Sequence, residues 1–216
     1  LKSVNSTSAV AQPQPPASTV TGGEPAEPEV KAAEWASDRP YLKALRAARP
    51  EQWERVLAEQ QALHGTLPAF WFDVSEFHHR AGRRAEALRL LLSALELPTR
   101  DSETLGIVAE RLVRWADFDR AVALYERMSA MDRKHPHPRR GLALALARRA
   151  AAKRGEAARA DLARAIALLT DLALTVDDGD YEGFNLVALT EVNSIIARYR
   201  RLGGTDVPLD PRLIAN

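Results

Sequence analysis

The sequence predicts an all-α fold: a right-handed α-α superhelix of stacked helical hairpins that ends in a C-terminal capping helix. The main observation is a pattern of large and small residues that occurs twice, 34 positions apart. Such a period is typical of repeated helix–turn–helix units. In addition, prolines and glycines separate runs with helical spacing, and one amphipathic stretch follows the last hairpin. The first copy is Trp71, Val74, Ser75, His78, Gly82, Ala87, Leu91 and Ala94, and the second is Leu105, Val108, Ala109, Leu112, Ala116, Ala121, Tyr125 and Met128.

An irregular pair of helices is predicted before the two regular repeats. The first helix is expected to begin after an N-cap at Asp38, with Pro40 just inside it, and to stop near Pro50. A second helix is expected over about residues 51–63. A terminal unit of a repeat array must present one polar face to water, which explains its irregularity. The buried side of the second helix is predicted to carry Trp53, Val56, Leu57 and Leu63.

The two regular repeats predict four helices, with Gly82 and Ala116 in the turns between paired helices. Small residues at the contact points let the paired helices approach closely, and large residues fill the space between them. The four helices are expected over about residues 68–81, 84–97, 102–115 and 118–131. The residues predicted to be buried are Trp71, Val74, Leu91, Leu105, Val108, Leu112, Leu124 and Tyr125.

The repeat pattern continues into a third hairpin and then changes its period. A helix opened by Pro138 carries Leu142, Ala143 and Leu146, each 34 positions after its counterpart. The next match, at Ala165, comes 44 positions after Ala121. The ten extra residues lie within 147–164, a helix-favouring segment, so this hairpin is expected to project beyond its neighbours. A last helix is predicted over about residues 183–202, with an apolar stripe of Phe184, Ala188, Val192, Ile195, Ile196, Tyr199 and Leu202.

The chain is predicted to have three parts. Residues 1–37 hold five of the 13 prolines among Ser, Thr, Gly and Glu, a mixture typical of a disordered linker. Residues 38–202 form the helical repeat domain, and residues 203–216 are an exit linker toward a further domain. Because the first residue is Leu1 and the start reads as a linker, we expect a fragment of a longer protein.

Composition and motifs exclude several classes of function. The net charge of +1 gives no overall field for nucleic acid or an acidic partner. The absence of cysteine excludes disulfides and thiolate metal sites, and no apolar run approaches the ~20 residues of a membrane-spanning helix. No glycine-rich phosphate loop, nucleophile elbow or His–Glu–x–x–His motif occurs. We therefore expect no catalytic residue and no cofactor.

Three groups of residues are candidate metal ligands, and none is favoured. His78 and His79 point about 100° apart on a helix, so we interpret His78 as a core residue and His79 as a surface residue. His135 and His137 are expected in a proline-rich surface turn surrounded by positive charge. The acidic residues 177–182 have glycine too early for an EF-hand and lack its final glutamate.

The repeat pattern resembles that of the tetratricopeptide family over about residues 38–202. The resemblance implies that the first helix of each hairpin lines a concave groove for a protein partner. In chaperone-type members, a Lys/Asn/Asn set clamps a peptide carboxylate, but Phe72, Asp73 and Glu76 stand at those positions here, and only Arg80 and Arg114 match the basic position. A solvated inner face, or one filled by a neighbouring domain, is the alternative. The implied groove residues are Phe72, Asp73, Glu76, His79, Arg80, Glu103, Gly106, Ile107, Glu110, Val113 and Arg114.

Three short segments carry a narrower resemblance. Residues 41–45 (YLKAL), 186–196 (LVALTEVNSII) and 210–216 (DPRLIAN) are similar to the helical-repeat segment of bacterial VIT–von Willebrand A proteins. In that family, a proline-rich linker precedes the repeats and a β-rich domain of unknown function follows them. The resemblance implies a periplasmic or secreted location, with a cytoplasmic location as the alternative.

The function predicted from these observations is a non-catalytic protein–protein interaction and spacer module. Residues 133–164 carry ten Lys and Arg against two acidic residues, whereas residues 165–197 carry six acidic residues and no Lys or Arg. The basic hairpin is therefore a second candidate contact for a protein partner, through Arg148, Arg149, Lys153 and Arg154. Nucleic-acid binding by the same stretch is an alternative that lacks interleaved aromatic residues. A metal-binding or enzymatic domain is the other alternative.

Overall fold

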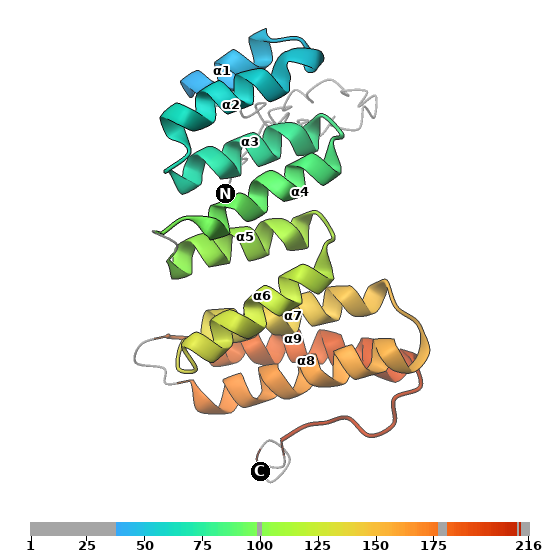
Figure 1. The fold of residues 1–216 in the computed structure, drawn as a ribbon. Helices are drawn as coiled ribbons and strands as arrows, with labels where there is room; N and C mark the ends of the chain where they lie inside the picture. Colours follow the sequence, from blue (N-terminus) through green and yellow to red (C-terminus); the bar gives the residue numbers. More distant parts are fainter. Residues whose placement is uncertain (1–37, 99–100, 177–180, 211, 213–216) are drawn as a thin grey trace, which may run out of the picture. The chain divides into compact units, whose positions relative to one another are not determined.

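Figure 1 shows the computed structural model of the chain, which describes residues 38–98, 101–176, 181–210 and 212. The predicted linker of residues 1–37 and the acidic residues 177–180 lie outside the described residues. Across the described ranges there are nine α-helices, two short 3₁₀ helices and no strand. The predicted all-α fold is therefore confirmed.

Within residues 38–216, successive helices pack as hairpins. Helix α1 packs on α2, α3 on α4, α5 on α6 and α7 on α8, while α7 also contacts α6 and α9 covers α8. The 3₁₀ helix η1 (Pro50–Gln52) leads into α2, and η2 (Ala94–Glu96) prolongs α4. The α-helices are α1 (Pro40–Ala47), α2 (Trp53–His64), α3 (Pro68–Arg80), α4 (Arg84–Ser93), α5 (Ser102–Arg114), α6 (Phe118–Met131), α7 (Pro136–Ala151), α8 (Gly155–Thr175) and α9 (Phe184–Arg201).

The first helix begins one residue later than its predicted cap implied. Helix α1 starts at Pro40 with Arg39 in the cap position, so the predicted N-cap at Asp38 is wrong. The Asp38 carboxylate lies 3.3 Å from the Lys43 Nζ instead, one turn into the helix. A carboxylate near the first turn is favourable for the helix dipole even without the capping bond.

Helix α2 buries a different side from the one predicted. Val56 and Leu57 are buried as expected, and Trp53 is half-buried, but Leu63 is 72% exposed. The neighbouring His64 turns inward in its place, with its ring centroid 5.2 Å from that of Tyr41. The aromatic contact between α1 and α2 thus determines which side chain of the last turn of α2 faces inward. The spacing of apolar residues within α2 does not predict this contact.

The two turns between paired helices share one backbone conformation. Gly82 has φ = 78° and Ala116 has φ = 62°, both in the left-handed region. The following residue in each case, Arg83 or Asp117, donates its backbone N–H to a carbonyl of the preceding helix. These bonds satisfy helix carbonyls that would otherwise lack a partner. The predicted turn positions are confirmed.

The core lies between the paired helices. Its centre consists of side chains that α3–α8 turn toward one another, including Ala87 and Ala121, both fully buried at the predicted close contacts. All eight residues predicted to be buried have exposures of 7% or less, namely Trp71, Val74, Leu91, Leu105, Val108, Leu112, Leu124 and Tyr125.

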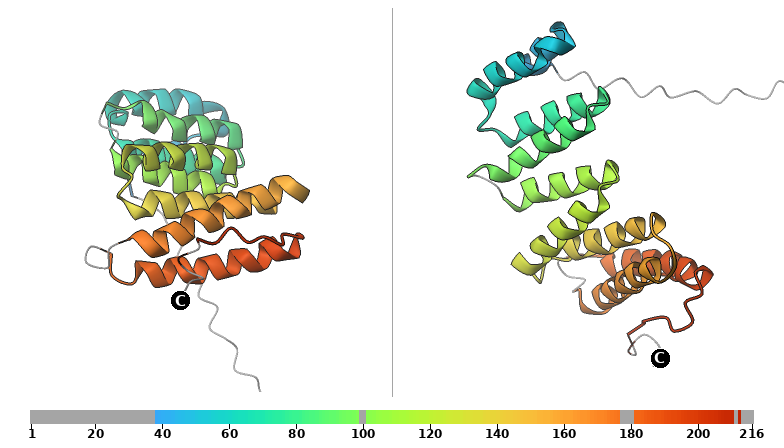
Figure 2. Two further views of the ribbon diagram at one scale, coloured as in Figure 1. Left: turned by 90° about the horizontal axis from the view of Figure 1, so that it is seen from below. Right: turned by 45° about the vertical axis from the view of Figure 1, so that its right-hand side comes forward.

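The third hairpin is longer than the second, as the broken period predicts. Helices α7 and α8 contain 16 and 21 residues, compared with 13 and 14 for α5 and α6. The extra residues lengthen both helices instead of forming a loop. The left view of Figure 2 shows the α7–α8 hairpin extending past the hairpins before it.

Helix α7 begins at Pro136, two residues before the predicted Pro138. Both prolines fall in the first turn, where backbone nitrogens have no helical acceptor to lose. His137 therefore lies on the helix, and His135 precedes it as a half-buried residue. The prediction of a surface turn is therefore correct in part, since His137 is exposed but lies on the helix, and His135 lies before the helix but is half-buried.

Helix α9 closes the repeats, and the segment after it packs back on them. Val207 and Leu209 contact the core, and the Tyr199 hydroxyl donates to the Asp206 carbonyl at 3.1 Å. Leu202, predicted within the apolar stripe, is 40% exposed because α9 ends just before it. Among the described helices, none is long and apolar enough to cross a membrane.

Candidate functional site

A groove of about 580 Å³ opens between α5 and α7, and α6 forms its floor. The sequence positions α5 by an N-cap, since the Asp101 carboxylate accepts a hydrogen bond from the Thr104 backbone N–H at 2.7 Å. The side chains that α5 and α6 contribute are Ser102, Glu103, Gly106, Glu110, Val113, Arg114, Tyr125 and Met128. Those from α7 and its approach are His135, His137, Pro138, Arg140, Gly141, Leu144, Ala145 and Arg148.

Two glycines shape the groove in different ways. A Cβ placed on Gly141 would overlap the Tyr125 ring, so this glycine lets α7 approach α6. A Cβ on Gly106 would have only the Met128 methyl nearby, at 3.8 Å, which is an ordinary contact. Gly141 is therefore needed for packing, whereas Gly106 leaves space in the groove and exposes backbone.

The wall of the groove carries both signs of charge over an apolar floor. Glu110, Arg114 and Arg148 are exposed, and none of them forms an ion pair within 4.0 Å in the described part of the chain. Burial in the floor, reinforced by the charge of Glu110, raises the pKa of Tyr125 to about 12, and Arg148 opposes this shift. The groove thus combines acceptors, donors and an apolar surface.

The equivalent space between α3 and α5 is filled by the protein's own side chains. Arg111 of α5 donates through Nη1 to the Phe72 carbonyl oxygen, and its Cζ lies 5.8 Å from the centre of the Phe72 ring. The same guanidinium lies 4.0 Å from the Glu76 carboxylate, which also receives a hydrogen bond from Arg80 Nε at 3.0 Å. This junction is therefore closed by one arginine from the next repeat.

The electrostatics of this closed junction follow from its partial burial. Burial is the largest influence on Glu76 and opposes its ionisation, but the Arg80 hydrogen bond and the charges of Arg111, Arg80 and Arg114 outweigh it and lower its pKa. Burial also lowers the pKa of Arg111, and the Glu76 charge opposes that shift. One carboxylate thus holds several guanidinium groups together between two helices.

Two more contacts seal the α3 side. The Asp73 carboxylate accepts a hydrogen bond from the Tyr41 hydroxyl at 2.7 Å and lies 3.2 Å from Arg39 Nε. Burial, followed by the Asp73 hydrogen bond, raises the pKa of that tyrosine. His79 stacks on Trp115 with ring centroids 4.4 Å apart and 2° between the planes. Asp73 and His79 therefore already have interaction partners within the chain.

The structure thus separates the groove residues implied by the sequence into two sets. Glu103, Gly106, Glu110, Val113 and Arg114 line the open groove. Ile107 packs against the core beside them. Phe72, Asp73, Glu76, His79 and Arg80 belong to the closed side.

Six groove residues of α7 were missed by the sequence analysis, and for four of them the signal was present. His137, Arg140, Gly141 and Leu144 lie 34 positions after Glu103, Gly106, Ile107 and Glu110. The 34-residue period therefore predicts concave positions in the third repeat as well as core positions. Arg148, identified only as part of the basic hairpin, is likewise 34 positions after Arg114.

The structure places the predicted histidine pairs in two different settings. His78 is 2% exposed in the core, as predicted, and neither ring nitrogen has a hydrogen-bond partner among the described residues. His135 and His137 face each other at 5.3 Å and both contact the Tyr181 ring. A search of the described residues finds no cluster of three or more side chains that could hold a metal ion.

Part of the basic hairpin pairs with acidic side chains of the same hairpin. Arg149 and Lys153 contact the Asp161 carboxylate at 2.7 and 2.9 Å, and Arg149 also reaches Asp119 of α6 at 3.1 Å. Burial is the largest influence on Asp161 and opposes its ionisation, but the hydrogen bonds from Arg149 and Lys153 outweigh it and lower its pKa. Arg154 is exposed.

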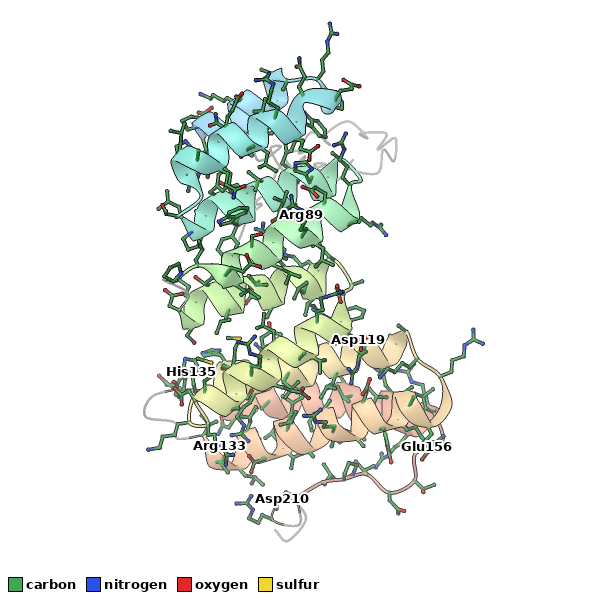
Figure 3. All side chains as sticks on the ribbon, viewed as in Figure 1. Arg89, Asp119, Arg133, His135, Glu156 and Asp210 are labelled. Carbon is green, nitrogen blue, oxygen red and sulfur yellow. The ribbon has the colours of Figure 1, made fainter. Side chains whose placement is uncertain are left out.

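Other basic residues pair with the segment that follows. Arg139 contacts Asp171 of α8, and Arg140 Nε lies 2.9 Å from Glu191 of α9. Figure 3 shows Arg133 and His135 near one end of the long hairpin and Glu156 at the other. The opposite charges of the two segments are therefore used partly to join α7, α8 and α9.

Comparisons with known proteins yield only distant structural likeness. No family model and no curated protein sequence matches the chain. Among solved structures, PcrH from Pseudomonas aeruginosa aligns with 60% of this chain and 91% of its own, at 14% identity and a TM-score of 0.37. The MamA RS-1 ArsTM double mutant aligns with 77% of this chain and 93% of its own, at 16% identity and a TM-score of 0.36.

Proposed function

We propose that this chain is a non-catalytic scaffold that binds an extended segment of a partner protein in the groove between α5 and α7. The observation that carries the proposal is the contrast between two neighbouring junctions. The junction between α3 and α5 is filled by Arg111 and Phe72, whereas the next one leaves a volume of about 580 Å³ with exposed charges. That volume lies within the ~300–1,000 Å³ usual for ligand sites.

The chemistry of the groove suits a peptide. Tyr125, Met128 and Leu144 provide apolar area, while Glu110, Arg114 and Arg148 provide charged groups on the rim. Apolar contacts supply most of the free energy of binding, and a few placed polar groups supply orientation and specificity. Rigid helices on both sides hold these groups in place without a large ordering cost.

A second contact at the tip of the long hairpin is part of the proposal. Arg149 and Lys153 are engaged by Asp161, so Arg148 and Arg154 are the exposed cations there. Exposed charges of this kind steer association more than they stabilise a complex. Arg148 also lines the groove, so a partner seated there would lie beside the hairpin.

The resemblance of residues 41–45, 186–196 and 210–216 supports a wider context for the module. We propose that it is the helical-repeat part of a larger bacterial protein of the VIT–von Willebrand A type, located in the periplasm or secreted. Residues 1–37 would be a linker before the repeats, and residues 203–216 would lead to the next domain. The complete gene product tests this: an encoded protein without von Willebrand A and C-terminal β-rich domains contradicts the assignment.

Binding to the groove is tested by selection of peptides and a matched pair of variants. Unstructured peptides are selected on the 216-residue chain, and their affinities are then measured for Gly106→Trp and Leu186→Trp. The first variant fills the groove, whereas the second adds the same side chain on α9, where Leu186 is 66% exposed. We expect a tenfold or larger loss for the first only. Equal affinities for both variants, or failure to select any peptide, would contradict the proposal.

A further inference from the structure

We propose that the α5–α7 groove binds an arginine side chain of the partner, held between the Glu110 carboxylate and the Gly106 carbonyl oxygen. The inference deepens the proposed function and depends on it, since it names the chemical group that the groove selects. Its basis is the closed junction of the same molecule, where an arginine of the chain already makes the corresponding contacts.

The closed junction shows how an arginine is held between two first helices of neighbouring hairpins. The Arg111 guanidinium donates to the Phe72 carbonyl and lies 4.0 Å from Glu76. Its side chain is only 14% exposed, and that of Glu76 is 19% exposed. A planar guanidinium can bond a carbonyl and a carboxylate at the same time, which an ammonium group does less well.

At the corresponding repeat positions, the open groove has both hydrogen-bond acceptors of the closed junction but no counterpart of Arg111. Glu110 lies 34 positions after Glu76, and Gly106 lies 34 positions after Phe72. At the position 34 residues after Arg111 stands Ala145, which cannot reach across. Gly106, Glu110 and Ala145 all line the groove. The groove therefore has the place for a guanidinium and lacks the residue that would fill it.

The two acceptors are accessible in the open groove. Glu110 is exposed and forms no ion pair within 4.0 Å in the part of the chain that the structure describes, whereas Glu76 contacts both Arg80 and Arg111. Gly106 has no side chain, so a partner group can approach its backbone closely. Because Gly106 stands where the closed junction has Phe72, the open groove also lacks the ring that lies 5.8 Å from the Arg111 Cζ.

Two cations of the chain lie near the proposed site, and the closed junction shows that they are compatible with it. Arg114 and Arg148 line the same groove and would repel a bound guanidinium. In the closed junction, however, Arg111 binds although Arg80 and Arg114 act on the same Glu76 carboxylate. Arg80 and Arg114 are the counterparts of Arg114 and Arg148. The neighbouring cations therefore favour a partner that presents one arginine, not a run of basic residues.

The test uses N-acetyl-arginine methylamide as the probe and the backbone amide of Gly106 as the reporter in NMR titrations. The uncharged citrulline analogue, which has nearly the same shape, is the ligand control. We expect weak binding in the millimolar range, saturable shifts at Gly106, and at least about a tenfold weaker response to citrulline, because charge-assisted bonds are the stronger ones. Gly155, at the tip of the long hairpin, should not respond.

Three variants assign the response to the proposed contacts. Glu110→Gln should weaken arginine binding about tenfold or more, whereas Glu54→Gln, the same change at an exposed position of α2 outside the groove, should leave it within about twofold. Ala145→Arg should fill the site from within and abolish the response. Arg111→Ala should create a second site for the probe beside Glu76, because the substitution empties the place that the Arg111 guanidinium occupies.

Two results would overturn the inference: equal responses to arginine and citrulline, or an unchanged arginine affinity in Glu110→Gln. Failure of the arginine inference can be distinguished from failure of the proposed peptide-binding function. Selected peptides that bind in a Gly106→Trp-sensitive manner but do not need an arginine would leave the scaffold function intact and remove only the arginine. Selected peptides that lose affinity when their arginine becomes citrulline would support both.

Discussion

Phe72 and Gly106 occupy the same position of successive repeats, and so do Arg111 and Ala145. In the first junction, the large pair meets across the space between α3 and α5. In the second junction, the small pair lines an open groove between α5 and α7. The acidic residue at the centre of each junction is the same, Glu76 in the first and Glu110 in the second, so the contrast in side-chain size at these two positions distinguishes the junctions.

The comparison shows that a repeat array can combine a stabilised junction and a binding site within one architecture. Large side chains from neighbouring repeats bury each other and join the hairpins, as Arg111 does with Phe72. Small residues at the same register leave surface that only another molecule can cover. The position of a residue in the repeat therefore predicts which way its side chain points. Whether that side chain can contact a partner depends on the size of the residue that faces it from the next repeat.

The largest effect is expected from Phe72→Ala, which would open the closed junction. Phe72 is 9% exposed, and removing a buried phenyl ring costs about 3–5 kcal/mol of unfolding free energy. Leu144→Ala in the wall of the open groove should cost less, about 1 kcal/mol, because that side chain is only half-buried. Urea unfolding of both variants measures the difference. Similar losses would mean that the two junctions are packed alike.

Alanine at the two groove glycines should change stability in opposite directions. Gly141→Ala should lose about 1–2 kcal/mol because its Cβ would overlap the Tyr125 ring. Gly106→Ala should gain up to about 1 kcal/mol, because alanine is the better helix former and Met128 lies at an ordinary distance of 3.8 Å. Thermal unfolding of the pair provides the measurement. A loss at both sites would show that the groove is narrower than described.

The core position that holds leucine in the later repeats holds histidine in the first. His78 corresponds to Leu112 and Leu146, and both of its buried nitrogens lack hydrogen-bond partners in the part of the chain that the structure describes. Burial lowers its pKa, with Arg83 and Arg89 acting in the same direction and Glu86 opposing them. The unfolded state therefore binds the proton more readily, and stability should fall as the pH decreases below about 6.5, the usual histidine value.

His78→Leu should remove this pH dependence and raise stability by about 1–2 kcal/mol at neutral pH, since it removes unsatisfied buried polar groups. Unfolding curves between about pH 7 and pH 5 compare the variant with the parent chain. His79→Leu is the control, because His79 stacks on Trp115 at the surface of the same helix. An acid response that persists in His78→Leu would assign it to other groups.

The sequence predicted the hairpins and the core well because both follow from local spacing. The 34-residue period placed Ala87 and Ala121 at close contacts, and both are fully buried. It could not predict that the junction between α3 and α5 is closed, since that depends on Arg111 reaching a carbonyl 39 positions earlier in the chain. The inward turn of His64 was missed for the same reason, because its contact, Tyr41, is on another helix.

The smallest effect concerns the turns, where the two repeats differ by one methyl group. Gly82 and Ala116 both have a left-handed backbone, with φ = 78° and 62°. Glycine adopts this conformation at no steric cost, whereas alanine is strained by about 1–2 kcal/mol. Glycine also loses more conformational entropy on folding, by up to about 1 kcal/mol, which offsets part of the relief.

Ala116→Gly should therefore stabilise the chain by a net amount of up to about 1 kcal/mol. The same substitution at Ala123, an exposed residue inside α6, provides the matched control and should destabilise by about 1 kcal/mol. Because both changes remove one methyl group, their opposite signs isolate the backbone conformation as the cause. Differential scanning calorimetry resolves shifts of this size. A destabilised Ala116→Gly variant would show that the Ala116 methyl group makes a contact that outweighs the strain.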